Sequence, residues 1–70
     1  MQVLHAEQTG SDSPWDIWSV SGTHERGPWS MTILVEQDGR DIEVDKTEGL
    51  SEEEAQEAVV AWQIWLEDNS

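Results

Sequence analysis

The 70-residue sequence contains no cysteine, and three basic residues stand against sixteen aspartates and glutamates. The absence of cysteine excludes disulfides and thiolate metal sites, and it leaves the redox compartment undetermined. The formal net charge of -13 makes the chain repel phosphate backbones, so we expect no direct binding to nucleic acid. Anionic membrane surfaces are disfavoured for the same reason.

Motifs for targeting, catalysis and metal binding are also lacking. Residues 1–5 have neither a basic region nor a long apolar run, so we expect no signal peptide or membrane span and take a cytoplasmic protein as the default. The sequence has no nucleophile elbow and no phosphate-binding glycine loop. His5 and His24 are too isolated for a zinc signature, and residues 38–41 lack the order of a calcium loop. These absences favour a protein that is not an enzyme and binds no metal or cofactor.

A chain of this length forms one small domain, residues 1–70, near the lower size limit for a self-stabilising core. Five tryptophans help, because each buries a large area with few rotatable bonds.

The most apolar stretch, residues 58–66, lies near the C-terminus and follows a helix-start signature. Ser51 and Glu54 have the spacing of a capping box, and the acidic first turn suits the positive end of the helix dipole. We therefore predict a helix over residues 51–68. Its core face is a stripe at helical spacing, made of Ala55, Ala58, Val59, Trp62, Trp65 and Leu66.

The opposite face of this helix carries two aliphatic residues, Val60 and Ile64, on the side of Glu53, Glu57 and Glu67. Two interpretations remain open. Exposed aliphatic side chains are ordinary on folded surfaces. Alternatively, the two residues form a ridge that docks a partner or a second copy of the chain.

The first two-thirds of the chain has the alternation of β-strands. We predict a short strand over residues 2–8 with Leu4 and Ala6 on one face, a strand over 15–21 and a clear strand over 29–37. Loops over residues 9–14 and 22–28 separate them. Asp38-Gly39 predicts a two-residue type I′ turn.

That turn sets the register of the hairpin: Gln37 faces Arg40, Val35 faces Ile42, and the apolar faces match. The elements together predict an α+β fold, a small antiparallel three- or four-stranded meander with one C-terminal helix packed on one face. The predicted core consists of Trp18, Val20, Trp29, Met31, Ile33, Val35, Ile42 and Val44 against Val59, Trp62, Trp65 and Leu66.

The other sheet face has no cover in this arrangement, unless the N-terminal segment folds over its apolar residues Trp15, Ile17 and Leu34. The same face carries an acidic ladder of Asp41, Glu43 and Asp45, at intervals of ~6.6 Å, which is of the order of phosphate spacing in nucleic acid. Glu36 would face Asp41, and like charges directly opposite each other destabilise a sheet. The ladder is either a solvated face or a surface that imitates nucleic acid.

Two classes of function follow. The first is a small acidic protein-binding module, an inhibitor that occupies a basic, nucleic-acid-binding surface of a partner by mimicry, as phage-encoded anti-defence proteins do. The second is a homo-oligomeric or accessory structural subunit, joined through Val60, Ile64 and Trp65, whose acidity reflects a high-salt cytoplasm. A cation held by carboxylates is a third alternative. The predicted partner-binding residues are Glu36, Asp41, Glu43, Asp45, Glu53, Glu57, Val60, Ile64, Trp15, Ile17 and Leu34.

Overall fold

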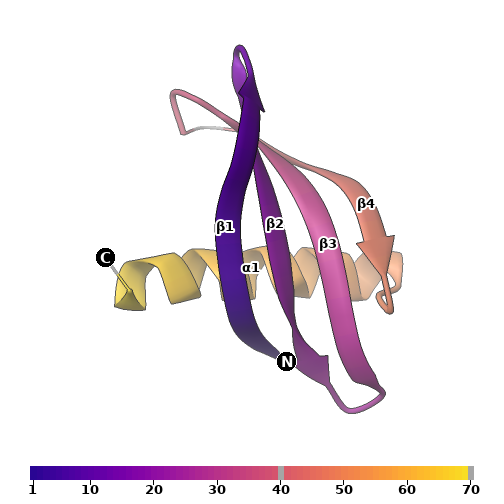
Figure 1. Cartoon of the computed structure of the whole chain (residues 1–70). Coiled ribbons are helices and arrows are strands. Elements are labelled where there is room, and N and C mark those ends of the chain that lie inside the picture. Colours follow the sequence, from indigo (N-terminus) through magenta and orange to yellow (C-terminus); the bar gives the residue numbers. More distant parts are fainter. Residues whose placement is uncertain (40, 70) are drawn as a thin grey trace.

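The computed structural model describes residues 1–39 and 41–69 and shows four antiparallel strands followed by one helix. The elements are β1 (Gln2–Asp12), β2 (Trp15–His24), β3 (Gly27–Glu36), β4 (Ile42–Glu48) and α1 (Glu52–Asp68). The strands pair in chain order, so β1 and β4 are the two edges of the sheet. Figure 1 shows α1 lying across one face of this sheet. The predicted α+β meander with a C-terminal helix is confirmed, and it has four strands.

The core lies between α1 and the sheet. Val20 and Ile33 are fully buried at its centre, and α1 covers them with Ala55, Ala58 and Trp62. The indole of Trp62 meets Trp18 edge to face, with 5.5 Å between ring centroids, and this geometry is favourable for aromatic pairs. The predicted core residues are all buried or packed against the buried cluster, so that prediction is confirmed.

The helix begins as the sequence predicts. Ser51 is the N-cap, its Oγ accepts from the Glu54 amide at 3.2 Å, and the Glu54 carboxylate accepts from the Ser51 amide at 2.9 Å. This capping box satisfies two backbone amides that have no partner inside the helix.

The predicted loops are too long in two places. β1 continues to Asp12, which leaves Ser13 and Pro14, joined by a cis peptide bond, as the turn. β2 continues to His24 and β3 begins at Gly27, so the second turn shrinks to two residues. Backbone pairing needs no apolar side chain, and polar residues therefore extend both hairpins beyond the alternating pattern.

The predicted face of β1 is also wrong at one residue. Val3 is buried and Ala6 packs against the core, whereas Leu4 is 57% exposed. The pairing of β1 with β2 shifts between Val3 and His5, so one extra residue interrupts the alternation at Leu4.

The hairpin between β3 and β4 has the predicted register, with Val35 opposite Ile42, but a different turn. The Gly39 amide donates to the Glu36 carbonyl at 2.7 Å, which centres the turn on Gln37 and Asp38. Among the described residues a positive φ occurs only at glycines, so Asp38 does not adopt the conformation that a type I′ turn requires. Among Gln37, Asp38 and Gly39, the glycine is the residue that takes the left-handed conformation, with φ 80°, at no steric cost. The predicted pairing of Gln37 with Arg40 lies outside the described residues.

Candidate protein-binding site on the outer sheet face

The sheet face opposite α1 gathers the predicted apolar and acidic residues into two neighbouring rows. In the first row Trp15 pairs with Asp12 on β1 and with Glu36 on β3, and the Glu36 amide donates to the Asp41 carbonyl at 2.8 Å. In the second row Leu34 pairs with Ile17 on β2 and with Glu43 on β4. We call these residues the sheet-face cluster: Trp15, Ile17, Leu34, Glu36, Asp41 and Glu43.

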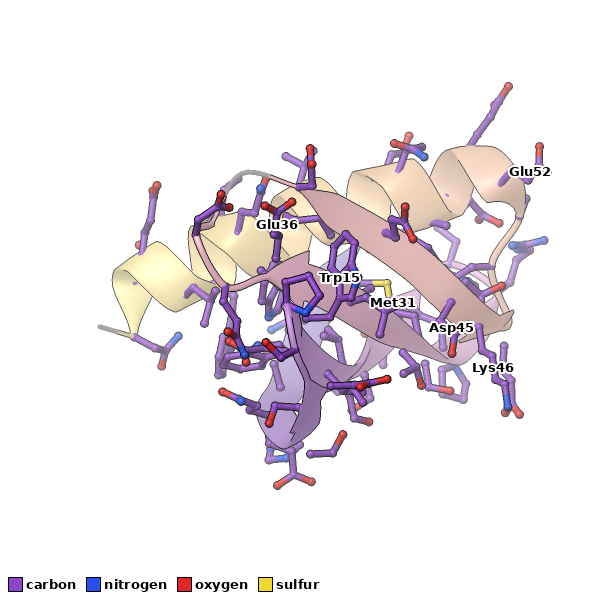
Figure 2. The ribbon with its side chains drawn as sticks, turned by 90° about the horizontal axis from the view of Figure 1, so that it is seen from above. Trp15, Met31, Glu36, Asp45, Lys46 and Glu52 are labelled. Atoms are coloured by element: carbon purple, nitrogen blue, oxygen red, sulfur yellow. The ribbon has the colours of Figure 1, made fainter. Side chains whose placement is uncertain are left out.

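The apolar members of the cluster are half-buried, and no described element covers them. β1 does not fold over them, because it extends the sheet beside β2 as an edge strand. Part of their burial comes from close packing within the face. A Cβ atom placed on Gly10 would lie 3.9 Å from Ile17 Cδ1, so the isoleucine side chain lies over this glycine. Figure 2 shows Trp15 and Glu36 near each other, away from the end of the molecule that carries Lys46.

The acidic members crowd one another around the β3–β4 turn. Hydrogen bonding to the Asp38 carboxyl, followed by that to Asp41, raises the pKa of Glu36 to about 7, and partial desolvation and the two neighbouring charges add to the effect. Near neutral pH the Glu36 carboxyl is therefore partly protonated. A cation placed here would favour the fully ionised cluster and relieve the repulsion.

The structure removes Asp45 from the predicted acidic ladder. The register of β3 with β4 shifts between Thr32 and Ile33, and Asp45 is the extra residue of this bulge. The position opposite Thr32, next along the outer face, is occupied by Lys46. A single inserted residue resets the alternation of a strand, so Asp41 and Glu43 remain as an acidic pair and the three-residue ladder is wrong.

The predicted residues on α1 are not brought together with the sheet-face cluster. Val60 and Ile64 are 55% and 54% exposed, so the helix has an uncovered aliphatic ridge. Glu53 and Glu57 are exposed on the same helix, across the core from the outer face of the sheet. Trp65, which was also expected in a contact between copies, is half-buried and packs against the core.

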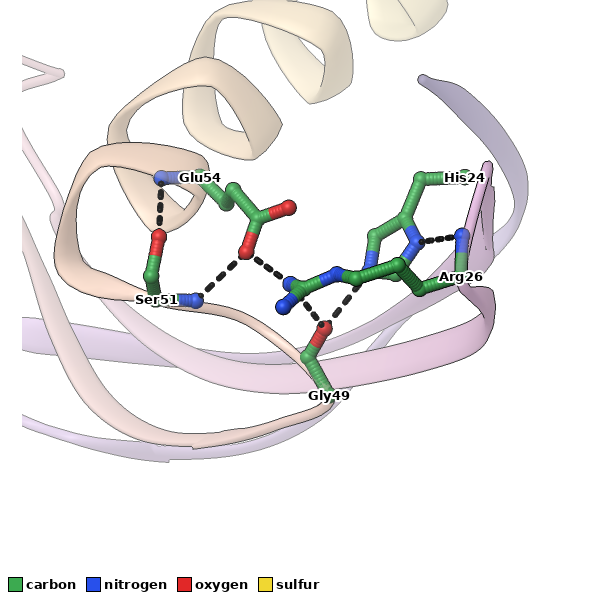
Figure 3. Close-up of polar contacts among 5 residues, drawn as sticks. All are labelled: His24, Arg26, Gly49, Ser51 and Glu54. Atoms are coloured by element: carbon green, nitrogen blue, oxygen red, sulfur yellow. Dashed lines mark hydrogen bonds and ion pairs between the residues drawn. The ribbon is translucent and has the colours of Figure 1, made fainter.

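Sequence reasoning missed a polar clasp that joins the β2–β3 turn to the start of α1 (Figure 3). His24 Nε2 lies 2.6 Å from the Gly49 carbonyl, and the Arg26 amide donates to His24 Nδ1 at 3.0 Å. A carbonyl can only accept, so Nε2 is the donor to Gly49 and Nδ1 is the acceptor from Arg26. His24 is therefore part of a long-range contact between β2 and the segment that precedes α1.

Arg26 completes the clasp by pairing with the Glu54 carboxylate. The Ser51 backbone amide lowers the pKa of Glu54, and its hydroxyl and the Arg26 charge act in the same direction. The residues that meet here lie more than twenty positions apart, so no local spacing pattern could have identified them. The clasp places the Arg26 charge beside α1, where it does not offset the sheet-face cluster.

Within residues 1–39 and 41–69, no group of three or more histidine and carboxylate side chains is arranged to hold a metal ion. In the same part of the chain no helix is long and apolar enough to cross a membrane. Comparison with protein-family models, curated proteins and solved structures gives no match.

Proposed function

We propose that this protein is a non-enzymatic binding module that occupies a basic, nucleic-acid-binding surface of a partner protein, in the cytoplasm, and thereby inhibits the partner. The observation that carries the proposal is the composition of the sheet-face cluster. Three apolar side chains lie in the middle of an open sheet face, with Asp12 on one flank and Glu36, Asp41 and Glu43 on the other.

This arrangement suits a protein interface with an apolar centre and a charged rim. The apolar centre supplies burial, while the carboxylates select a cationic partner and accelerate its encounter. Crowding at Glu36 strengthens the argument, because a folded chain that tolerates like charges side by side becomes more stable when a partner neutralises them.

The test uses amide replacements that keep the shape of the cluster. A variant with Glu36→Gln, Asp41→Asn and Glu43→Gln is immobilised beside the wild-type chain, and both are exposed to extract from the source cell. We expect the wild type to retain proteins that a short DNA or RNA duplex elutes, and we expect the variant to lose them. Each captured protein is then assayed for loss of nucleic-acid binding when the free chain is added.

The matched control removes three carboxylates outside the sheet-face cluster instead, through Glu25→Gln, Glu67→Gln and Asp68→Asn. It should capture the same partners as the wild type, and circular dichroism should show both variants folded. Retention of the same proteins by the sheet-face variant, or failure of the duplex to elute them, would contradict the proposal.

A second candidate is self-association through the Val60 and Ile64 ridge, and the exposure of these two side chains favours it. If two copies pack their α1 helices antiparallel and the helices cross at the level of residue 62, Val60 of one copy lies against Ile64 of the other. The same arrangement places Glu57 against Glu67. High salt would have to screen that repulsion. Light scattering on a sizing column should report a monomer at low salt. A dimer that forms at high salt, and that Ile64→Glu abolishes without loss of the fold, would identify the ridge as its interface. A mass that does not change between low and high salt would reject this candidate.

A further inference from the structure

A groove of about 600 Å³ runs between the edge strand β4 and the first turns of α1. Four consecutive residues of β4, Val44 to Thr47, line one wall. Val44 pairs with Ile33 on the core face and Lys46 pairs with Thr32 on the outer face, so a groove that both of them line lies along the edge of the strand. Leu50 and Ala55 add apolar surface on the other side.

Among the described residues, no strand pairs with β4 along this edge. The Glu36 amide bonds to the Asp41 carbonyl, and alternate residues of an antiparallel strand direct their amides to opposite edges. Ile42 and Val44 therefore turn their N–H and C=O groups away from β3. No other strand among residues 1–39 and 41–69 lies beyond β4, so these groups are available to an added strand.

The charge around the groove determines what can enter it. Asp45, Glu52 and Glu53 line it beside one base, Lys46. Figure 2 shows Asp45 and Lys46 on β4 and Glu52 on α1 at the same end of the molecule. An extended segment with alternating apolar and basic side chains matches this surface, because one set fits the apolar lining and the other meets the carboxylates.

We infer that this groove binds an extended basic peptide segment of a partner protein, which adds to the sheet as a fifth strand beside β4. A second copy of the chain is a poor occupant, since pairing two β4 edges brings Asp45 and its acidic neighbours against the same residues of the other copy. The groove shares no residue with the sheet-face cluster. The inference therefore goes beyond the proposed function and can fail or succeed independently of it.

The experiment uses a blocked heptapeptide of alternating lysine and valine, together with two analogues that carry N-methyl groups on the valine amides or on the lysine amides. All three have the same charge. In a peptide that pairs with β4, one set of amides faces β4 and the other faces solvent. We therefore expect the analogue methylated on the amides that face β4 to bind at least about tenfold more weakly than the parent peptide, and the other analogue to bind like the parent.

Amide resonances of the full chain locate the binding. The parent peptide should shift the signals of residues 44–47 and 50–56 and slow hydrogen exchange at Ile42 and Val44. Replacing Glu52 and Glu53 by Gln should weaken binding, whereas the sheet-face variant with Glu36→Gln, Asp41→Asn and Glu43→Gln should bind normally. The inference is overturned if both analogues match the parent, if no peptide binds, or if the shifts map to Asp41 and Glu43. Protection of Val44 by self-association without peptide would likewise overturn it, with a second copy as the occupant.

Discussion

Single residues show how little space the core leaves. Gly22 on β2 lies where the chain passes Gln2 and Trp29, and an added Cβ atom would be 2.0 Å from Gln2 O and 2.6 Å from Trp29 Cζ2. Neither neighbour can yield easily, because one is backbone and the other is a buried ring. Gly10 differs, since the nearest atom to an added Cβ there is the end of the Ile17 side chain.

We therefore expect Gly22→Ala to lower the free energy of unfolding by about 3 kcal/mol, the upper part of the usual range for overpacking. Gly10→Ala should change it by less than about 1 kcal/mol, because glycine is unfavourable in a strand and the alanine Cβ would make only an ordinary van der Waals contact with Ile17. Urea unfolding followed by tryptophan fluorescence measures both. Equal effects of the two substitutions would show that the space around Gly22 is not limiting.

Glu36 predicts how stability depends on pH. Its pKa is about 7 in the folded protein, against 4.5 for an unperturbed glutamate. Between these values the folded chain holds a proton that the unfolded chain has released, so the free energy of unfolding falls as pH rises through this window. The loss approaches its full size as the pH rises past the folded pKa.

Glu36→Gln removes the carboxyl that causes this loss. We therefore expect the urea midpoint of the variant to exceed that of the wild type by a larger margin at pH 8 than at pH 5. Glu43→Gln removes one charge from the same face, without the Asp38 and Asp41 contacts that raise the pKa of Glu36. Its effect should vary less with pH. The same pH dependence in both variants would mean that net charge, rather than crowding at the turn, sets the behaviour.

At the scale of elements, side-chain contacts as well as helix propensity stabilise the start of α1. The capping box fixes Ser51 and Glu54, and the Glu54 carboxylate also meets Arg26 from the β2–β3 turn. Removing the Ser51 hydroxyl leaves the Glu54 amide without its acceptor.

Ser51→Ala should cost about 1 kcal/mol of stability, the usual loss for an N-cap. Ser11→Ala on the exposed edge strand β1 is the matched control and should be nearly neutral. Thermal unfolding of the two variants checks this, and an equal loss in both would count against the cap.

The helix and the β3–β4 register could be predicted because each depends on local, periodic signals. Apolar spacing identified the core face of α1, and matching faces set Val35 opposite Ile42. The errors occur where an extra residue or a distant contact decides the structure. The bulges at Leu4 and Asp45 cannot be recognised in the alternation of apolar and polar residues. β1 is longer than predicted because the backbone of its polar residues pairs with β2. The same limit applies to the candidate site. Its apolar residues and Glu36, Asp41 and Glu43 were identified, whereas Asp45 was misplaced and the clasp and the groove beside β4 were missed.

For the whole molecule, the net charge of -13 is distributed over a body measuring 35 × 24 × 18 Å. At an ionic strength of about 0.01 M the screening length is ~30 Å, so nearly every pair of carboxylates repels. At about 0.15 M it is ~8 Å, and repulsion is confined to neighbours such as those around Glu36. Much of the repulsion is therefore removed before physiological salt is reached.

The melting temperature should accordingly rise between these two salt concentrations and then level off, while circular dichroism shows a folded chain at the lower one. In a domain of this size, each kcal/mol of repulsion removed raises the melting temperature by about 4–8 °C. The variant with Glu36→Gln, Asp41→Asn and Glu43→Gln should show a smaller rise, since three crowded carboxylates are gone. A chain adapted to a high-salt cytoplasm behaves differently: it loses its fold at low salt and continues to gain stability towards molar salt. That result would favour the oligomeric subunit, whereas a plateau favours carboxylates retained for a cationic partner.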